Sequence, residues 1–214
     1  MNLNLYVITD EGLAGGLPHS EIARRAVLGG ANVIQLRDKS LPSREMVRVG
    51  REIREITRST GAIFIVNDRL DIALACGADG VHLGQDDMGC GTARQLSPTG
   101  FIIGVSVGSV DEALAAEQQG ADYVAVSPVF STGSKPDAGP GYGLATVRDI
   151  RAAVSIPVIA IGGIGSANAA DVIGAGADGI AVISAVVSQP DITAAARGLA
   201  AIIAAAKHAR RGTP

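Results

Sequence analysis

Polar side chains alternate along the segment 35–39, which reads Gln-Leu-Arg-Asp-Lys. Alternate residues of a β-strand point to the same side of a sheet, so we expect Gln35, Arg37 and Lys39 to face one way. Two buried cations are costly unless an anion neutralises them, and a bound diphosphate would do so. The spacing therefore favours an anion site over its alternative, a pair of structural salt bridges with neighbouring carboxylates.

Two aspartates, Asp68 and Asp87, follow apolar runs that we expect to be adjacent strands. Carboxylates that converge near a diphosphate would bind Mg²⁺, because this ion takes one or two carboxylates together with substrate oxygens and waters. Each aspartate could instead cap the helix that follows it. Their place beside Arg37 and Lys39 favours the metal site.

A second group of residues is suited to binding a phosphate. The segment Thr132-Gly133-Ser134-Lys135 offers two hydroxyls, backbone N–H groups and a cation, in a long loop (130–143) that we expect to close over a ligand. Gly162-Gly163 and Ile183-Ser184 follow two later apolar runs, at the corner where barrels commonly bind phosphate. Two anion sites, one of them metal-assisted, suit the displacement of diphosphate from one substrate by a second, phosphorylated substrate.

These residues come at the ends of eight short, mostly β-branched runs, each followed by a helical pattern. The predicted strands are Leu5–Ile8, Val33–Leu36, Ile63–Val66, Gly80–Leu83, Phe101–Val105, Tyr123–Val126, Pro157–Ile161 and Gly179–Ile183. Helical spacing predicts helices over 20–29, over 43–59, from a capping box at Ser109 to Glu112, and over Asp191–Arg210.

A Gly-Ala-Asn or Gly-Ala-Asp tripeptide recurs before every second predicted strand, at 30–32, 77–79, 120–122 and 176–178. Its glycine supplies a left-handed helix stop. Eight strand–helix units without a linker predict a (β/α)8 TIM barrel, in a single domain over residues 1–214; the alternative is an open, doubly wound sheet. In a barrel the chemistry lies at the carboxyl ends of the strands, where the polar residues occur.

Composition limits the class of protein. Of the 214 residues, 47% are hydrophobic, which excludes general disorder. The net charge of −3 provides no positive electrostatic field that would attract nucleic acid. We expect no membrane span, since charges or glycines interrupt every long apolar stretch. Cys76 and Cys90 cannot form a disulfide framework, and the first ten residues do not read as a signal peptide, so we expect a cytoplasmic protein. A homo-oligomer is compatible with these features.

The histidines and cysteines suggest no protein nucleophile, because no Cys–His or Ser–His arrangement is evident. His82 lies within a predicted strand, which favours a structural role. His19 and His208 are expected at the surface.

Several ordered motifs resemble the thiamine phosphate synthase family, and the resemblance runs from Tyr6 to Ser184. They are YVITD (6–10), QLRDK (35–39), VNDR (66–69), GVHLGQDD (80–87), IGVS (103–106), PVFSTGSK (128–135) and AIGGI (160–164). The resemblance implies that a pyrimidine carrying a diphosphooxymethyl group is joined to a thiazole phosphate, plain or carboxylated, with release of diphosphate. It also implies a dissociative mechanism, in which the aminopyrimidine stabilises a benzylic-type cation.

The resemblance assigns roles to individual residues. Those implied to hold the pyrimidine diphosphate are Gln35, Arg37, Lys39, Asn67, Ser106 and Lys135. Arg37, Lys39, Ser106 and Lys135 are the implied catalytic residues, and Asp68 and Asp87 the implied Mg²⁺ ligands. Those implied to hold the thiazole phosphate are Thr132, Gly133, Ser134, Gly163, Ile183 and Ser184.

Three positions depart from the family pattern. Ser134 stands where threonine is usual, Ser127 where glycine is common, and Gly108 where histidine is frequent. A sister family on the same barrel, the thiazole tautomerases, uses a histidine at about this last position and often lacks the metal aspartates. Here the histidine is absent and both aspartates are present, which favours the transferase. The alternatives are a tautomerase and a non-catalytic barrel that binds phosphorylated ligands.

Overall fold

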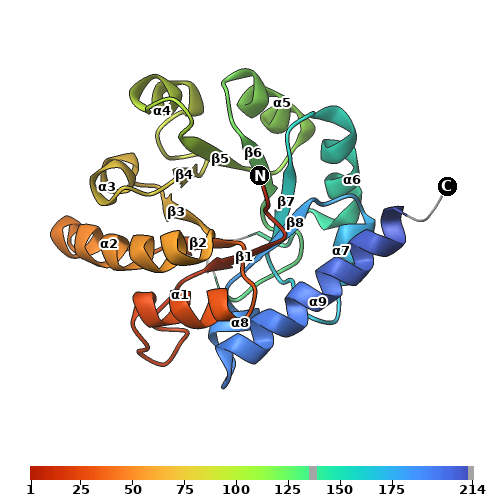
Figure 1. Ribbon diagram of the computed structural model, residues 1–214. Helices are drawn as coiled ribbons and strands as arrows, with labels where there is room; N and C mark the ends of the chain where they lie inside the picture. The colour runs from red at the N-terminus through yellow and green to blue at the C-terminus, as the bar shows by residue number, and fades with distance from the viewer. Residues whose placement is uncertain (135–138, 212–214) are drawn as a thin grey trace.

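Eight parallel strands close into a barrel in the computed structural model, which describes residues 1–134 and 139–211 (Figure 1). The strands pair in chain order, and β1 pairs with β8 in the register Leu5↔Ile180. This pairing closes the sheet, so the predicted (β/α)8 barrel is confirmed and the open sheet is excluded. The strands are β1 Leu5–Ile8, β2 Val33–Leu36, β3 Ile63–Asn67, β4 Gly80–Leu83, β5 Ile102–Val107, β6 Tyr123–Val126, β7 Val158–Ile161 and β8 Gly179–Val182.

Helices surround this barrel and cover the outer faces of its strands (Figure 1). They are α1 His19–Leu28, α2 Ser43–Thr60, α3 Leu70–Cys76, α4 Cys90–Leu96, α5 Val110–Gln118, α6 Gly143–Ala153, α7 Ala169–Gly174, α8 Ser184–Val187 and α9 Ile192–Arg211. The strands are buried on both faces, which explains why they read as continuous aliphatic runs rather than as alternating patterns.

The predicted helix signals have the expected structural causes. In α2 the buried stripe runs through Met46, Val49 and Ile53 and continues at Thr57, whereas Ile56 is only half-buried. The capping box of α5 is present: the Ser109 hydroxyl accepts from the N–H of Glu112 at 3.2 Å. The Glu112 carboxylate accepts from the N–H of Gly108, the residue before the N-cap, at 2.7 Å, so the second contact of the box is displaced by one residue.

The predicted strand β2 ends earlier than the argument from alternation requires. It stops at Leu36, and Lys39 lies beyond it in a bend with its side chain exposed. Arg37 also follows the strand, so the prediction that Gln35, Arg37 and Lys39 share one face of a single strand is wrong for both cations. Only a longer strand would have kept the alternation.

The recurring tripeptides end helices as predicted. Their glycines, Gly30, Gly77, Gly120 and Gly176, all have positive φ, between 72° and 111°. The third residue has a further role that the sequence did not reveal. Its side chain accepts a hydrogen bond from the backbone N–H at or near the start of the preceding strand: Asn32 from Leu5 (3.1 Å), Asp79 from Phe64 (2.8 Å), Asp122 from Ile103 (2.7 Å) and Asp178 from Val158 (2.9 Å).

Each of the three aspartates also binds an arginine of an outer helix. Arg54 of α2 donates to Asp79, Arg94 of α4 to Asp122, and Arg151 of α6 to Asp178. We call these aspartates, with Asn32, the strand-start acceptors. They join helix, strand and neighbouring strand at the end of the barrel where strands begin.

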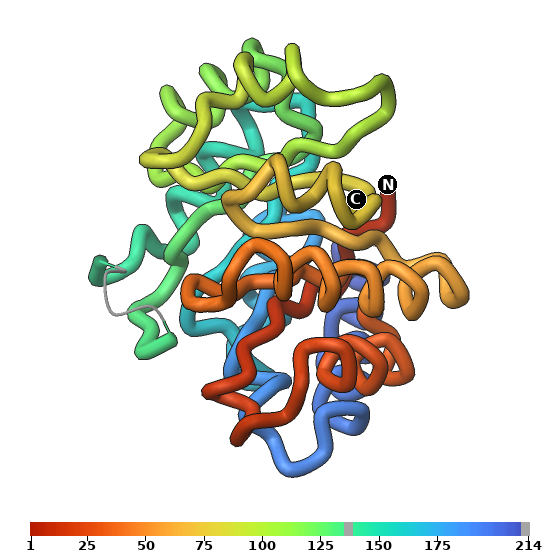
Figure 2. Tube along the Cα trace, turned by 90° about the vertical axis from the view of Figure 1, so that its left-hand side faces the viewer, coloured from red at the N-terminus to blue at the C-terminus, as the bar shows by residue number. Residues whose placement is uncertain are grey.

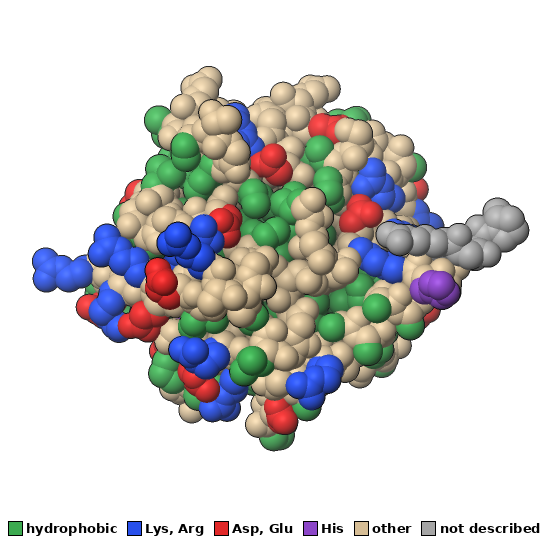
Figure 3. Space-filling model, in the orientation of Figure 1, with side chains coloured by type: hydrophobic (Ala, Val, Ile, Leu, Met, Phe, Trp, Pro, Cys, Tyr) green, Lys and Arg blue, Asp and Glu red, His purple; other side chains and the backbone are tan. Residues whose placement is uncertain are grey.

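Among the helices of the described residues, none combines the length and the hydropathy that a membrane-spanning helix requires. On the face drawn in Figure 3, Lys and Arg side chains lie among carboxylates rather than in one basic area, in keeping with the net charge of −3.

Candidate active site

The segment that follows β6 lies at the opposite end of the barrel from the N-terminus (Figure 2). This end carries the carboxyl ends of the strands, and the residues predicted to do chemistry lie near those ends or just after them. The barrel therefore gathers them at one rim, which we call the mouth.

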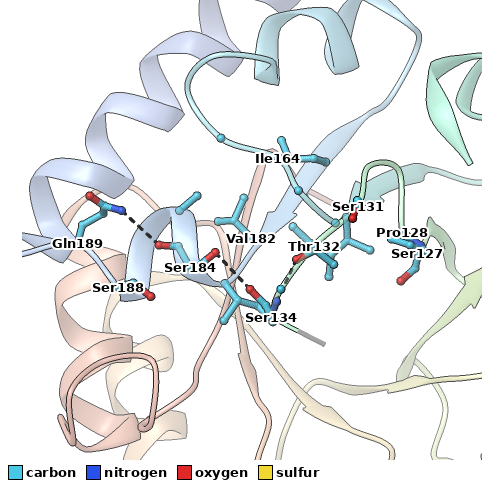
Figure 4. Close-up of a pocket in the computed structure, with 18 residues that line it drawn as sticks. Ser127, Pro128, Ser131, Thr132, Ser134, Ile164, Val182, Ser184, Ser188 and Gln189 are labelled. Carbon is cyan, nitrogen blue, oxygen red and sulfur yellow. Dashed lines mark hydrogen bonds between the residues drawn. The ribbon is translucent and has the colours of Figure 1, made fainter. Parts of the chain in front are cut away.

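A cavity of about 430 Å³ opens at the mouth between the segment after β6, the turn after β7 and the start of α8. Its lining includes all six residues predicted to hold the thiazole phosphate: Thr132, Gly133, Ser134, Gly163, Ile183 and Ser184. The hydroxyl of Ser134 donates to that of Ser184 at 3.2 Å, so the two sides of the cavity are in direct contact (Figure 4). The N–H of Ser134 donates to the Thr132 hydroxyl at 3.2 Å.

The two glycines after β7 are required by a close approach of the chain. Gly162 has φ 102° and Gly163 has φ 61°, in the left-handed region. A Cβ on Gly163 would lie 2.6 Å from the carbonyl oxygen of Ser131, and one on Gly162 would lie 2.5 Å from the Cβ of Pro128. The Gly-Gly pair thus lets the segment after β6 pack against the turn after β7, which brings Thr132 and Ser134 to the cavity.

The short helix α8 begins at Ser184 with Ile183 as its N-cap. An extra helix at this corner is the arrangement in which barrels commonly bind phosphate. Sequence reasoning missed Ser188 and Gln189, which also line the cavity. Ser188 could have been found, because it comes four residues after Ser184 and so lies on the same side of a helical turn.

Arg37 lies at the mouth with 13% of its side chain exposed. Its nearest carboxylate is that of Asp10, at 3.7 Å, so part of the salt-bridge alternative is realised. Its Nε is buried and, within the described part of the structure, has no hydrogen-bond partner. A buried donor without an acceptor is costly, and an anionic oxygen would satisfy it.

Asp38 shapes the turn that carries Arg37 and Lys39. One carboxylate oxygen accepts from the N–H groups of Ser40 and Leu41, both at 2.7 Å. Burial opposes ionisation, but these two N–H groups, together with His19 and the Ser40 hydroxyl, lower the pKa of Asp38 to about 2. Asp38 is therefore a fixed anion between two cations.

His19 is buried, with 1% of its surface exposed, so its predicted place at the surface is wrong. Its ring nitrogens lie 2.7 Å from the Thr9 hydroxyl and 3.1 Å from the Asp38 carboxylate. The imidazole is removed from water because these polar partners replace the solvent.

The two predicted metal ligands lie after adjacent strands, and neither one caps a helix. Asp68 has φ 62°, and the N–H of Arg69 donates to the carbonyl of Asn67 at 2.7 Å, which makes Asp68 the centre of a strained γ-turn. Arg69 is the N-cap of α3. Asp87 accepts from the N–H of Gly84 at 2.7 Å, and α4 begins only at Cys90.

These carboxylates fit Mg²⁺ in kind and number. The described residues contain no cluster of three or more potential metal-binding side chains. Mg²⁺ needs no such cluster where a substrate diphosphate completes its coordination, since one or two carboxylates then suffice. The strained turn at Asp68 is the observation that favours a role beyond packing.

A chain of hydrogen bonds crosses the barrel interior below the mouth. Gln35 donates to the Tyr6 hydroxyl at 2.7 Å, which lies 3.1 Å from the Tyr123 hydroxyl. His82 bridges onward, 3.0 Å from the Tyr123 hydroxyl and 2.9 Å from that of Ser106. Two predicted substrate-binding residues, Gln35 and Ser106, are therefore the two ends of one network.

Burial raises the pKa of both Tyr6 and Tyr123, so both phenols stay neutral and can donate. The Tyr123 ring occupies space that only glycine at position 104 permits, because a Cβ there would lie 2.0 Å from the ring.

Asn67 ends β3 in register with His82, half-buried at the same rim. Lys135, predicted for the same site, lies outside the described residues.

Gly108, which departs from the family pattern, lies against Tyr142. A Cβ on Gly108 would lie 2.4 Å from the Tyr142 ring, which is 51% exposed. The ring thus takes the space of a side chain at position 108. Ser127, the second departure, lines the cavity beside Pro128 (Figure 4).

Comparison with known proteins decides the family. The family described as thiamine monophosphate synthase matches residues 5–186. The chain belongs to the thiamine monophosphate synthase family. It is 63% identical over 211 residues to a thiamine-phosphate synthase of Methanoregula boonei, covering 99% of this chain and 98% of that protein.

Other members of the thiamine monophosphate synthase family agree with this assignment. A thiamine-phosphate synthase of Methanoculleus marisnigri is 62% identical, covering 97% of this chain and 98% of the relative. The solved thiamine phosphate pyrophosphorylase of Pyrococcus furiosus is 47% identical, with a TM-score of 0.89, covering 96% of this chain and 97% of the other. The resemblance drawn from the motifs is therefore confirmed, and the tautomerase alternative is not favoured.

Proposed function

We propose that the mouth binds two phosphorylated substrates side by side and joins them in the thiamine phosphate synthase reaction. The overall activity is that of the family: the chain is a transferase of thiamine biosynthesis. The observation that carries the proposal is the convergence of all six predicted thiazole-phosphate residues on one cavity, with Arg37 at the same end of the barrel.

The pyrimidine diphosphate is the substrate of the β2–β5 side. Arg37, Lys39 and Lys135 supply positive charge for its diphosphate. Gln35, Asn67 and Ser106 bind its polar groups, and the network through Tyr6, Tyr123 and His82 fixes Gln35 and Ser106. The buried Nε of Arg37 supports this assignment, because a diphosphate oxygen would satisfy it.

Asp68 and Asp87 would hold the Mg²⁺ that this reaction requires. When bound, the ion would neutralise charge on the departing diphosphate. The carboxylates fit this role because they come from the ends of adjacent strands and leave coordination positions for substrate oxygens.

The thiazole phosphate is the substrate of the β6–β8 side. Thr132, Ser134 and Ser184 donate hydroxyl hydrogen bonds to its phosphate, with Gly133, Gly163 and Ile183 forming the backbone around it. The bond between the pyrimidine methylene carbon and diphosphate breaks first, and its electron pair leaves with the diphosphate. The thiazole nitrogen then forms the new C–N bond. The protein orients the two substrates and supplies no nucleophile.

We further propose that the enzyme acts in the cytoplasm. Cys76 and Cys90 are both buried free thiols, in keeping with a reducing compartment. We propose only small phosphorylated molecules as its ligands, without nucleic acid. A homo-oligomer is compatible with this function, and sedimentation of the purified protein would test it.

The experiment is incubation of the purified protein with both substrates, with Mg²⁺ or with excess EDTA. We expect thiamine phosphate and diphosphate in equal amounts with Mg²⁺, and neither product with EDTA. Conversion of the thiazole substrate alone, without diphosphate release, would indicate the tautomerase. Binding of both substrates without any product would indicate a non-catalytic barrel.

A further inference from the structure

His19 is not among the residues predicted to bind substrate, but it is tied to the turn that carries two of the proposed substrate-binding cations. It begins α1, and its side chain is fully buried. One ring nitrogen lies 3.1 Å from Oδ2 of Asp38, and the other lies 2.7 Å from the Thr9 hydroxyl. Its backbone N–H donates to the Glu11 carboxylate at 2.9 Å. The residue is thus fixed from three directions.

Asp38 lies between Arg37 and Lys39 in the sequence, so its negative charge is close to two cations. A carboxylate beside two cations competes with an anionic substrate for both of them. Arg37 nevertheless has its ion pair with Asp10, at 3.7 Å, while the Asp38 carboxylate is hydrogen-bonded to the His19 ring, at 3.1 Å.

The two oxygens of Asp38 are used differently. Oδ1 accepts from Ser40 and Leu41 and so holds the turn. Oδ2 is directed to the His19 ring. With both oxygens occupied, the carboxylate is held away from Arg37 and Lys39.

We propose that His19 is a positioning residue that keeps the Asp38 carboxylate from pairing with Arg37 and Lys39, so that both cations stay available to the diphosphate. This inference rests on the proposed function of the mouth and adds to it a residue that does not touch substrate. Its loss lets Oδ2 turn to the cations, and binding of the diphosphate substrate weakens.

Two substitutions at position 19 separate this role from packing. The amide nitrogen of His19→Gln corresponds to Nε2 and can still donate to Asp38. The amide nitrogen of His19→Asn corresponds to Nδ1. The asparagine side chain therefore keeps its contact with Thr9 and loses the contact with Asp38. A purely structural role would penalise both variants alike.

The test measures the Kd for inorganic diphosphate by calorimetry in the presence of Mg²⁺, and the KM for each substrate. For His19→Asn we expect the Kd and the KM for the pyrimidine diphosphate to rise about tenfold, equivalent to ~1.4 kcal/mol. The KM for the thiazole phosphate stays unchanged. His19→Gln stays within about twofold of the unmodified chain.

The double variant His19→Asn with Asp38→Asn gives a second readout. It removes the competing charge while leaving an amide oxygen for the turn, so we expect most of the lost affinity to return. Ile22→Val, at a buried position one turn along α1, is the matched control: it lowers the melting temperature and leaves both KM values unchanged.

Equal losses in His19→Asn and His19→Gln, or no recovery in the double variant, would overturn the role of His19 while leaving the proposed function intact. An unmodified chain that neither binds diphosphate nor makes thiamine phosphate would overturn both.

Discussion

At Arg37 a guanidinium is largely withdrawn from water, while one of its N–H groups has no acceptor in the described structure. At Asp68 a non-glycine residue has φ 62°. Both features cost free energy in the folded protein, about 1–3 kcal/mol each. We propose that both features are retained because this end of the barrel binds a diphosphate, whose oxygens would accept from Arg37.

The charge of Asp68 can be separated from its backbone geometry. Asparagine tolerates positive φ about as well as aspartate, so Asp68→Asn keeps the γ-turn and removes the negative charge. We expect its melting temperature to stay close to that of the unmodified chain and its kcat at limiting Mg²⁺ to fall about 100-fold. Steady-state kinetics across a Mg²⁺ titration measure this.

Asp86→Asn is the control for that titration, since Asp86 is an exposed acidic residue next to Asp87. It should behave like the unmodified chain. An Asp68→Asn enzyme with an unchanged response to Mg²⁺ would contradict the metal role.

The sequence predicted candidate site residues from their types and positions, but it did not predict the surroundings of each residue. The places of Arg37, Asp68 and Ser184 just after strands could be predicted, because the aliphatic runs that precede them are local signals. The burial of His19 could not, because it depends on Asp38, which comes from a different strand–helix unit. The same holds for Tyr142, which meets Gly108 only in the folded chain.

Among the elements, the strand-start acceptors explain why the Gly-Ala-Asn/Asp tripeptide recurs. The glycine ends a helix, and the third residue accepts the N–H at or near the start of the preceding strand. The acceptor is asparagine at position 32 and aspartate at the three positions that also meet an arginine. The repeat is therefore a device that fixes neighbouring strands at one end of the barrel, leaving the other end free for the site.

Asp122 tests this device. Asp122→Ala leaves the N–H of Ile103 without its side-chain acceptor and Arg94 without its carboxylate, and we expect the free energy of unfolding to fall by about 2 kcal/mol. Asp122→Asn keeps the acceptor and loses a partly exposed ion pair, so the loss is below about 1 kcal/mol. Urea denaturation measures both.

The exposed Asp149 of α6 provides the comparison for those two variants, because Asp149→Ala also removes one surface carboxylate. It should change the unfolding free energy by less than about 0.5 kcal/mol. Equal losses in the alanine and asparagine variants of Asp122 would rule out the backbone acceptor as the main contribution.

The close approach between the turn after β7 and the segment after β6 can also be tested by substitution. Gly163→Ala places a Cβ 2.6 Å from the Ser131 carbonyl oxygen at φ 61°. The segment after β6 must then move, so we expect a higher KM for the thiazole phosphate and a smaller change in the KM for the pyrimidine diphosphate. Gly174→Ala in α7, outside the cavity, is the control, because a Cβ there meets nothing within 4 Å among the described residues. A normal KM for the thiazole phosphate in Gly163→Ala would show that this close approach does not shape the cavity.

Element types were predictable because aliphatic runs and left-handed glycines are local signals. The boundaries were less so. β7 begins at Val158 rather than Pro157, because proline has no N–H for the sheet, and β2 stops before the alternating polar residues end. Where a strand gives way to a catalytic turn depends on side-chain partners such as Asp38, and those are set by the rest of the fold.

In the molecule as a whole, closure of the barrel is what brings the two clusters of polar residues together. β1 and β8 are far apart in the sequence and paired in the structure, so the turn after β2 and the start of α8 lie at one rim. Residues from both halves of the chain are therefore brought to one rim, where we propose that they act on one pair of substrates.

The KM of each substrate in two variants distinguishes two separate anion sites from a single shared one. Arg37→Ala should raise the KM for the pyrimidine diphosphate at least tenfold and leave the KM for the thiazole phosphate within about twofold; Ser184→Ala should do the reverse, by about tenfold. Variants that raise both KM values together, or neither, would contradict two separate anion sites over one barrel mouth.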